Sequence, residues 1–299
     1  MWEFFALSTA FAWAIVTILD KVLLERYILS RNTYLILHGM IGLIPVMGML
    51  LVGRDLRYDP LSMLALALLS GILESIFVFF YYKALQIADA SVVAIFLQGV
   101  PVITMVISLV FFHENFSLLT YFGIVIIIVG TVLATLAGSP GRHRVEWKAI
   151  WAVLPALFAI SISYSLQSYT LRIINVDTLF ATARIGQWLV GLMLLSVPVV
   201  RNEFIGITTK LNRTILLTTI SIGLLNLLGV YLLNEAYSLG PLALVTTLAS
   251  VQPILVLLIV SAVNSIRPQT IPDEGSQKFF LPRAIATALV IVGVFLSSS

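Results

Sequence analysis

Glu74 is a carboxylate in the middle of a long apolar stretch at residues 61–83. An ionisable side chain at the centre of a membrane helix costs about 3 kcal/mol, so it is expected to face a cavity or a partner. Such a group could carry a proton or serve as counter-ion to a substrate ammonium. The structural alternative is a protonated Glu74 hydrogen-bonded to a neighbouring helix. We therefore treat Glu74 as a candidate substrate or proton site.

Arg184 and His38 are also ionisable residues inside apolar stretches. Arg184 could bind a substrate carboxylate, and His38 could titrate near neutral pH. Both lie close enough to the ends of their stretches for the side chains to reach the membrane surface instead. They are candidate site residues with that alternative left open.

Lys83 and Glu235 lie at the ends of two apolar stretches. They could form an ion pair that breaks as a gate opens. The alternative is that both are interfacial charges, which are tolerated where a helix leaves the membrane.

Pro101 and Pro253 fall inside two further apolar stretches. A proline within a helix removes one amide and frees the carbonyl four residues earlier, so both are predicted hinges or kinks. Interrupted helices at matching positions in two halves of a carrier point to a binding site. Polar residues beside these prolines are candidate binding residues: Gln98, Ser250 and Gln252.

The elements that must position these residues are ten apolar stretches. The chain has 299 residues, of which 60% are hydrophobic and only 10% charged, against about 25% charged in a soluble domain. Stretches of about 20 apolar residues predict membrane-spanning helices, because irregular backbone facing lipid would leave amides unpaired. The predicted spans are 3–24, 32–53, 61–83, 90–112, 117–137, 149–172, 178–200, 214–238, 241–264 and 281–298. The predicted fold class is an all-α polytopic membrane protein.

The ten spans read as two repeats of five, residues 1–138 and 139–299, joined by a turn-forming basic linker. A shift of 152 residues pairs Glu74 with Asn226 and Pro101 with Pro253, while a shift of 146 pairs His38 with Arg184. Both halves could thus present a polar group at one depth. Because five is odd, the second repeat must enter the membrane from the opposite side. This inverted arrangement predicts a substrate site near mid-membrane between the halves.

Most lysines and arginines fall in loops on the side opposite the two termini, whereas Arg54, Arg57 and Arg172 fall on the terminal side. Short loops rich in these residues favour the cytoplasm, which predicts termini outside it. The expected location is the inner cell membrane, as a multi-pass integral protein.

The run from Phe80 to Ala94, FYYKALQIADASVVA, resembles the junction of helices three and four in the drug/metabolite transporter superfamily, EamA type. This resemblance implies a ten-helix basket with a central cavity, alternating access and cytoplasmic termini, so sidedness stays open. In the second half the position matching Glu114 is Ile266, so an acidic residue found in the family is missing there. Further residues that fit the family are Pro101, Phe111, Phe112, His113, Gly123 and Gly130.

Several aromatic and amide residues lie on or near the helices that, by this resemblance, line the cavity. They could stack on an amphipathic substrate or hold a cation over a ring, although belts at the membrane surface explain such residues equally well. These candidates are Trp13, Tyr82, Tyr164 and Gln167. Glycines 39, 42 and 48 predict close helix packing instead.

No enzyme signature is found in the sequence. The chain has no cysteine, no second histidine of a zinc-binding helix and no Gly-rich phosphate loop. We expect no catalytic residues, no metal, no cofactor and no nucleic-acid partner. The expected partners are a small-molecule substrate, the lipid bilayer and a coupling proton, with the protein a monomer or homodimer.

The predicted function is secondary transport of small polar or amphipathic metabolites, with amino acids favoured and export implied by the family resemblance. Glu74 is the candidate proton carrier, so Glu74→Gln is predicted to abolish pH-driven flux with the fold intact. A lipid or lipid-linked headgroup flippase or scramblase is the alternative, and its sign would be Arg184 facing a lateral opening. A non-transporting scaffold is disfavoured, because it has no need of polar groups at mid-membrane.

Overall fold

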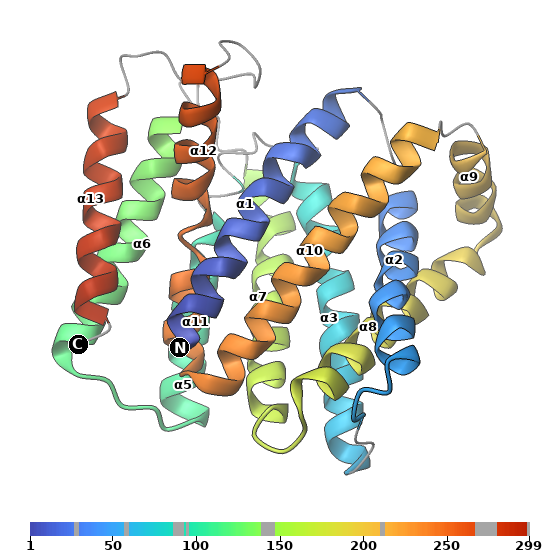
Figure 1. Cartoon of the computed structure of the whole chain (residues 1–299), viewed down its shortest axis with the longest axis horizontal. Helices are drawn as coiled ribbons and strands as arrows, with labels where there is room; N and C mark the ends of the chain where they lie inside the picture. The colour runs from blue at the N-terminus through green and yellow to red at the C-terminus, as the bar shows by residue number, and fades with distance from the viewer. Residues whose placement is uncertain are drawn as a thin grey trace.

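The computed structural model describes residues 1–26, 30–56, 60–85, 93, 96–138, 147–209, 213–266 and 280–297. Within these residues the chain forms helices and no strand (Figure 1). The helices are α1 (Trp2–Arg26), α2 (Arg31–Leu51), α3 (Leu61–Leu85), α5 (Gly99–Phe111), α6 (Leu118–Gly138), α7 (Trp147–Thr170), α8 (Val176–Leu195), α9 (Pro198–Thr208), α10 (Arg213–Leu239), α11 (Leu242–Ala249), α12 (Gln252–Ile266) and α13 (Phe280–Ser297).

Seven helical segments in the described part of the chain are long and apolar enough to cross a membrane. Two shorter apolar helices, Gly99–Phe111 and Leu118–Leu133, occupy the predicted spans 90–112 and 117–137. The all-α, multi-pass membrane fold predicted from the sequence is therefore confirmed, whereas the count of ten spans stays a prediction. The predicted linker between the halves and most of the run from 86 to 94 lie outside the described residues.

The predicted span 241–264 is not one helix. It is broken into α11 and α12 at Ser250 and Val251. Pro253 has no amide to donate to the carbonyl of Ala249, so the α-helical ladder stops there. The amide of Val251 instead donates to the carbonyl of Leu248 at 3.2 Å. The predicted kink at Pro253 is therefore a full break.

The predicted span 178–200 ends early, and a separate helix, α9, follows it. α8 stops at Leu195, and Pro198 then begins α9, a position at which its missing amide costs no hydrogen bond. None of the residues of α9 is buried, and Figure 1 shows it at one end of the molecule, beside α8 and α2. This helix was not predicted from the hydropathy pattern.

Helices from before residue 138 pack mainly on helices from after it. α1 packs along α10, α2 along α8, α3 along both α7 and α8, and α6 along α13. In Figure 1 the start of α1 and the end of α13 lie on the same side of the molecule, which we call the terminal face. The ends of α5, α7 and α10 lie on this face as well.

Two glycines set the spacing of α3 and α8. A Cβ atom on Gly71 would overlap the carbonyl of Ala183, and one on Gly186 would overlap the carbonyl of Leu68. Small residues that let membrane helices approach this closely are typical of tight helix pairs.

The glycines of α2 differ from one another. A Cβ on Gly39 would lie 3.0 Å from the Gln187 carbonyl oxygen, and the Arg184 side chain lies against Gly42. Close packing is thus confirmed at both positions. At Gly48 a Cβ would meet nothing within 4 Å, so the prediction for that glycine is wrong.

Candidate functional site

Glu74 and Arg184 form an ion pair in the interior of the helix bundle. Nη2 of Arg184 donates to Oε2 of Glu74 at 2.6 Å, joining the middle of α3 to α8. Glu74 is 6% exposed and Arg184 is fully buried. The prediction that the Arg184 side chain could reach the membrane surface is therefore wrong. The guanidinium instead balances the charge of the carboxylate, as expected for charges inside a membrane protein.

Two glutamine amides complete the hydrogen bonding of the Glu74 carboxylate. Nε2 of Gln167 donates to Oε1 at 2.5 Å, and Nε2 of Gln187 donates to Oε2 at 2.7 Å. Oε1 of Gln187 in turn accepts from Nη1 of Arg184 at 2.7 Å. Four side chains from α3, α7 and α8 thus form one network, which we call the inner network. Within it, we call Glu74 and Arg184 the inner pair.

Local helix geometry explains how these side chains meet. Arg184 and Gln187 are three residues apart and so share a face of α8. Gln167 also donates to Oγ of Ser163 one turn earlier on α7, at 3.1 Å. Gly71 lies three residues before Glu74, so the close approach of α3 and α8 occurs where the two charges meet.

Buried polar atoms without partners occur both within the inner network and on α10. Within the described residues, Oε1 of Gln167, Nε of Arg184, both side-chain polar atoms of Asn234 and the hydroxyl of Tyr237 have no hydrogen-bond partner. The rings of Tyr164 and Tyr237 lie 5.8 Å apart, joining α7 to α10. Buried polar atoms are usually paired, so these exceptions indicate a place for water or a ligand.

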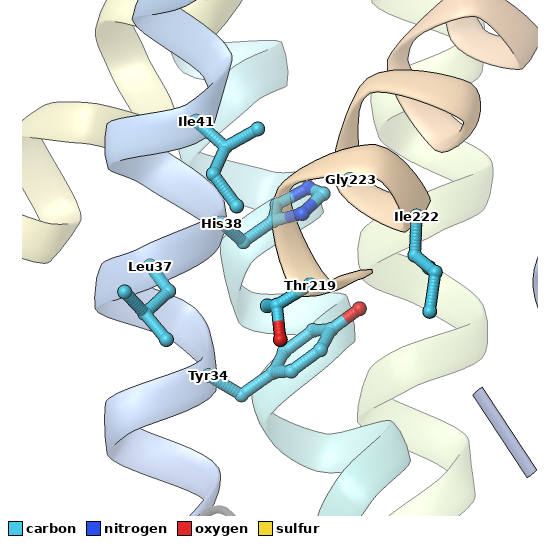
Figure 2. A pocket seen from close by; sticks show the side chains of 7 residues that line it. All are labelled: Tyr34, Leu37, His38, Ile41, Thr219, Ile222 and Gly223. Carbon is cyan, nitrogen blue, oxygen red and sulfur yellow. The ribbon is translucent and has the colours of Figure 1, made fainter. Parts of the chain in front are cut away.

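His38 lies on α2, one turn before the glycine that contacts Arg184. It stacks on Tyr34 with ring centroids 6.0 Å apart, and Tyr34 in turn lies 4.8 Å from Tyr82. Figure 2 shows His38 and Tyr34 beside Thr219 and Gly223 of α10, in a narrow crevice between the two helices. His38 and Tyr82 are therefore brought together through Tyr34, next to the inner pair rather than in it.

Trp13 and Gln252 form a second contact across the halves. Nε2 of Gln252 donates to the carbonyl of Trp13 at 3.2 Å and to Oγ1 of Thr17 at 2.7 Å. Nε1 of Trp13 is buried without a partner in the described structure, beside Gly229 of α10. Gln252 thus holds the start of α12 against α1.

The other residues beside the prolines lie at helix ends. Pro101 is buried in the first turn of α5, whose N-cap is Gln98. Ser250 caps α11, and its hydroxyl donates to the carbonyl of Thr247 at 2.7 Å. Both prolines therefore lie beside interruptions of the helices. A hydrogen bond of 2.8 Å between Thr104 and Thr246 joins the two interrupted segments.

Lys83 and Glu235 do not form the predicted gating pair. α3 runs away from the terminal face and α10 runs toward it, so their last turns lie on opposite sides of the molecule (Figure 1). Lys83 is exposed, with Nζ 6.0 Å from the centroid of the Phe80 ring. Asn226 is half-buried on α10 and does not take part in the inner network.

Gln187, Asn234 and Tyr237 were not predicted from the sequence as site residues. Gln187 had a usable signal, because it follows Arg184 at helical spacing. Asn234 and Tyr237 are polar residues in a predicted span, but their neighbours come from other helices. Among the described residues no cluster of three or more His, Asp or Glu side chains could hold a metal ion.

The structural sign expected of a flippase is not found in the described residues. Its expected sign was Arg184 facing a lateral opening between helices. Arg184 is fully buried, with its guanidinium directed at Glu74 and 5.3 Å from the ring of Phe180.

Comparison with known proteins finds a family match and a relative for the first half of the chain. Residues 1–136 match the EamA-like transporter family. Over 127 residues the chain is 33% identical to an uncharacterized transporter of Archaeoglobus fulgidus, a match that covers 42% of this chain and 44% of that protein. The chain therefore aligns with less than half the length of that relative.

A solved crystal structure shares the fold of the whole chain. The TM-score is 0.73 over 99% of this chain and 98% of the other, with 14% sequence identity, which is evidence for the fold alone. For residues 1–136, the predicted resemblance to the drug/metabolite transporter superfamily is confirmed by the family match. That match is with transporters rather than enzymes, and it includes Glu74 but ends before Arg184.

Proposed function

We propose, from the match of the first half to a transporter family, that this protein is a secondary transporter of small polar or amphipathic metabolites. Amino acids and related zwitterions are the proposed substrates, alternating access the mechanism, and export the direction, the last by analogy with the family alone. The observation that carries the proposal is the buried Glu74–Arg184 pair, contributed by one helix from each predicted half.

The charges of the inner pair favour a zwitterion. Separating a buried ion pair leaves two charges without compensation, which is strongly unfavourable. A zwitterion could take the place of both partners at once, with its carboxylate on Arg184 and its ammonium on Glu74. A substrate with one charge would leave either Glu74 or Arg184 unpaired in a membrane interior. The pair therefore selects for ligands that carry both signs.

The surrounding polar atoms support a ligand site at this place. Substrate pockets commonly combine aromatic walls with a few polar groups that fix orientation. Tyr164 and Tyr237 supply the aromatic wall. Asn234, Gln167 and the Tyr237 hydroxyl supply polar atoms that have no partner within the described residues.

The helix packing supports alternating access. The most extensive contacts run between the predicted halves, and corresponding helices exchange partners: α3 packs on α7 as α1 packs on α10. Under an inverted repeat, these two contacts are equivalent and can alternate in opening. The interruption at the start of α12 and the one before α5 are places where such a motion can be absorbed.

The proposed energy source is a substrate gradient or a coupled ion, because the sequence has no phosphate-binding loop for ATP. A proton is the candidate ion. Protonation of Glu74 would remove its charge and release Arg184, so that proton binding and opening of the pair would be one event.

Flux into proteoliposomes tests the proposal. The purified protein is reconstituted and supplied with each of the twenty labelled amino acids, with and without an imposed pH gradient. We expect saturable flux of a subset. For a transported amino acid, its hydroxy-acid analogue and its decarboxylated amine should compete at least about tenfold more weakly, because each lacks one charged hydrogen-bond partner.

The double variant E74Q/R184Q is the matched control. It removes both charges together and keeps side chains able to form hydrogen bonds, so no buried charge is left alone. If the pair binds substrate, this variant should fold but lose flux. Full flux in E74Q/R184Q would mean that the pair only fastens α3 to α8, and the proposed site would be wrong.

A further inference from the structure

A polar depression that is open to solvent lies at the terminal face, outside the network of the inner pair, and we call it the outer cavity. It has a volume of about 340 Å³, within the range of small-molecule sites. Its walls come from the loop after α5, the last turns of α7 and α10, and the turn into α11. The residues that line it and carry the argument are Glu114, Ser168, Arg172, Tyr237 and Ser238.

Glu114 is positioned by an unusual turn at the end of α5. His113 has a φ of 53°, a left-handed conformation that a side chain disfavours. The turn lets the amide of Glu114 donate back to the carbonyl of Ser108 at 3.1 Å. Its carboxylate is thereby held at the cavity wall, with Oε2 buried and without a partner among the described residues.

Arg172, which belongs to the second predicted half, lies opposite Glu114 in the cavity wall. Nη2 of Arg172 is 3.8 Å from Oε1 of Glu114, a distance too long for a hydrogen bond. The guanidinium is centred 4.5 Å from the ring of Phe112, which holds it by a cation–π contact. Its side chain is 50% exposed, so its N–H groups remain accessible to a ligand.

α7 and Tyr237 connect this cavity to the inner pair. Ser168 of α7 lines the cavity, while the preceding residue, Gln167, binds Glu74. Arg172 lies in the turn that follows the end of α7 at Thr170, five residues after Gln167. Tyr237 lines the cavity and also packs against Tyr164. Tyr164 lies on α7 three residues before Gln167, so the two tyrosines link the cavity wall to the helix that binds Glu74.

We propose that this cavity is a second, outer binding site for zwitterionic amino-acid-like ligands, on the same path as the inner pair. The ligand carboxylate binds Arg172, and its ammonium binds the carboxylate of Glu114, whose side chain is 17% exposed. The Tyr164–Tyr237 contact must open for the ligand to pass to Glu74 and Arg184. The choice of ligand class rests on the proposed function, whereas the cavity and its charges do not.

Cysteine protection tests the outer site directly. The protein contains no cysteine, so Ser168→Cys and Ser238→Cys each introduce a unique thiol into the cavity wall. A charged, membrane-impermeant methanethiosulfonate modifies the thiol in proteoliposomes, and the rate is compared with and without a probe. The probes are L-alanine, L-phenylalanine and L-glutamate. Ser62→Cys, exposed at the start of α3 on the same face, is the control.

We expect at least one probe to slow modification of Ser168→Cys and leave Ser62→Cys unaffected. Adding Arg172→Gln should weaken that protection at least about tenfold, because a charge-assisted hydrogen bond is lost. Protection should persist in the E74Q/R184Q background. No protection by any probe, or protection insensitive to Arg172→Gln and Glu114→Gln, would overturn the outer site.

The same experiment separates this inference from the proposed function. If E74Q/R184Q removes the protection and Arg172→Gln does not, the ligand is held at the inner pair and the outer site is wrong. If protection depends on Arg172 while no amino acid is transported, the outer site stands and the proposed transport function fails.

Discussion

Of the acid–arginine pairs that join the predicted halves in the described residues, the inner pair and the pair at the outer cavity differ most clearly in depth and geometry. At the inner pair, Arg184 and Glu74 are 2.6 Å apart, with side chains 0% and 8% exposed. At the outer pair, Arg172 and Glu114 are 3.8 Å apart, with side chains 50% and 17% exposed. In each pair the acid comes from the first half and the arginine from the second.

The difference shows that the depth of an acid–arginine pair determines how easily its two charges separate. The inner charges are held together by a short charge-assisted hydrogen bond and by the amides of Gln167 and Gln187, so they separate only when both are compensated. The outer charges are close enough to attract but not to bond, and water screens them. An outer pair of this kind can accept a ligand without first breaking a stable contact.

The largest expected effect is the loss of stability when one inner charge is removed. Arg184→Gln leaves Glu74 buried without a counter-ion, and Glu74→Gln does the same to Arg184. Each should lower the free energy of unfolding by about 3–5 kcal/mol. The same change at the half-exposed outer pair, Arg172→Gln, should cost less than about 1 kcal/mol. Unfolding of the purified variants in detergent, followed by circular dichroism, measures both.

The double variant E74Q/R184Q completes this cycle and should recover most of the stability lost in either single variant. The sequence alone predicted that Glu74→Gln would leave the fold intact, and the pairing with Arg184 changes that expectation. Equal stability of Arg184→Gln and Arg172→Gln would show that the two pairs do not differ as their geometry indicates.

A smaller effect is expected from the glycines that bring α3 and α8 together at the inner pair. Gly71→Ala places a methyl group against the Ala183 carbonyl, so the helices must separate. We expect a loss of about 1–3 kcal/mol, as in other overpacked sites. Gly48→Ala is the matched control, since its Cβ meets nothing within 4 Å. That variant should be neutral or gain up to about 1 kcal/mol from helix propensity. Equal losses in both variants would contradict close packing as the cause.

Much of the fold could be predicted from the sequence because hydropathy determines which segments enter a membrane. The predicted span 61–83 differs from α3 by two residues at one end only. The errors lie where backbone chemistry overrides hydropathy. Pro253 breaks one apolar stretch into α11 and α12, and Pro198 begins a separate exposed helix. An average of hydropathy over many residues does not register a single missing amide.

The site could be predicted in its members but not in its pairing. Glu74 and Arg184 were identified because an ionisable residue inside a membrane span is expected to face a cavity or a partner. Gln167 was identified because the family resemblance places its helix at the cavity. Repeat matching at a shift of 152 residues assigned Glu74 to Asn226, and the same shift pairs Lys83 with Glu235. In an inverted repeat, mates at helix ends lie on opposite faces, so matching positions need not meet. Glu74 and Arg184 meet because Gly71 and Gly186 let their helices approach, and single-sequence spacing does not reveal that contact.

The smallest expected effect concerns Tyr237, which lines the outer cavity and packs against Tyr164. The Tyr237 hydroxyl is buried without a partner in the described structure. Removing an unpaired buried polar group removes its desolvation penalty, so Tyr237→Phe should be neutral or up to about 1 kcal/mol more stable. On the same helix, the Tyr231 hydroxyl donates to Asp177 at 2.7 Å. Tyr231→Phe should therefore lose about 1–2 kcal/mol.

Measuring transport by the Tyr237→Phe variant tests whether its hydroxyl also has a functional role. If the Tyr237 hydroxyl binds substrate between the outer cavity and the inner pair, Tyr237→Phe should raise KM in proteoliposome flux even though the protein is no less stable. Stability and affinity would then change in opposite directions, which a purely structural tyrosine cannot produce. A Tyr237→Phe variant that loses stability as Tyr231→Phe does would show that its hydroxyl has a partner in the folded protein. The Tyr237 hydroxyl would then not be free to bind a substrate.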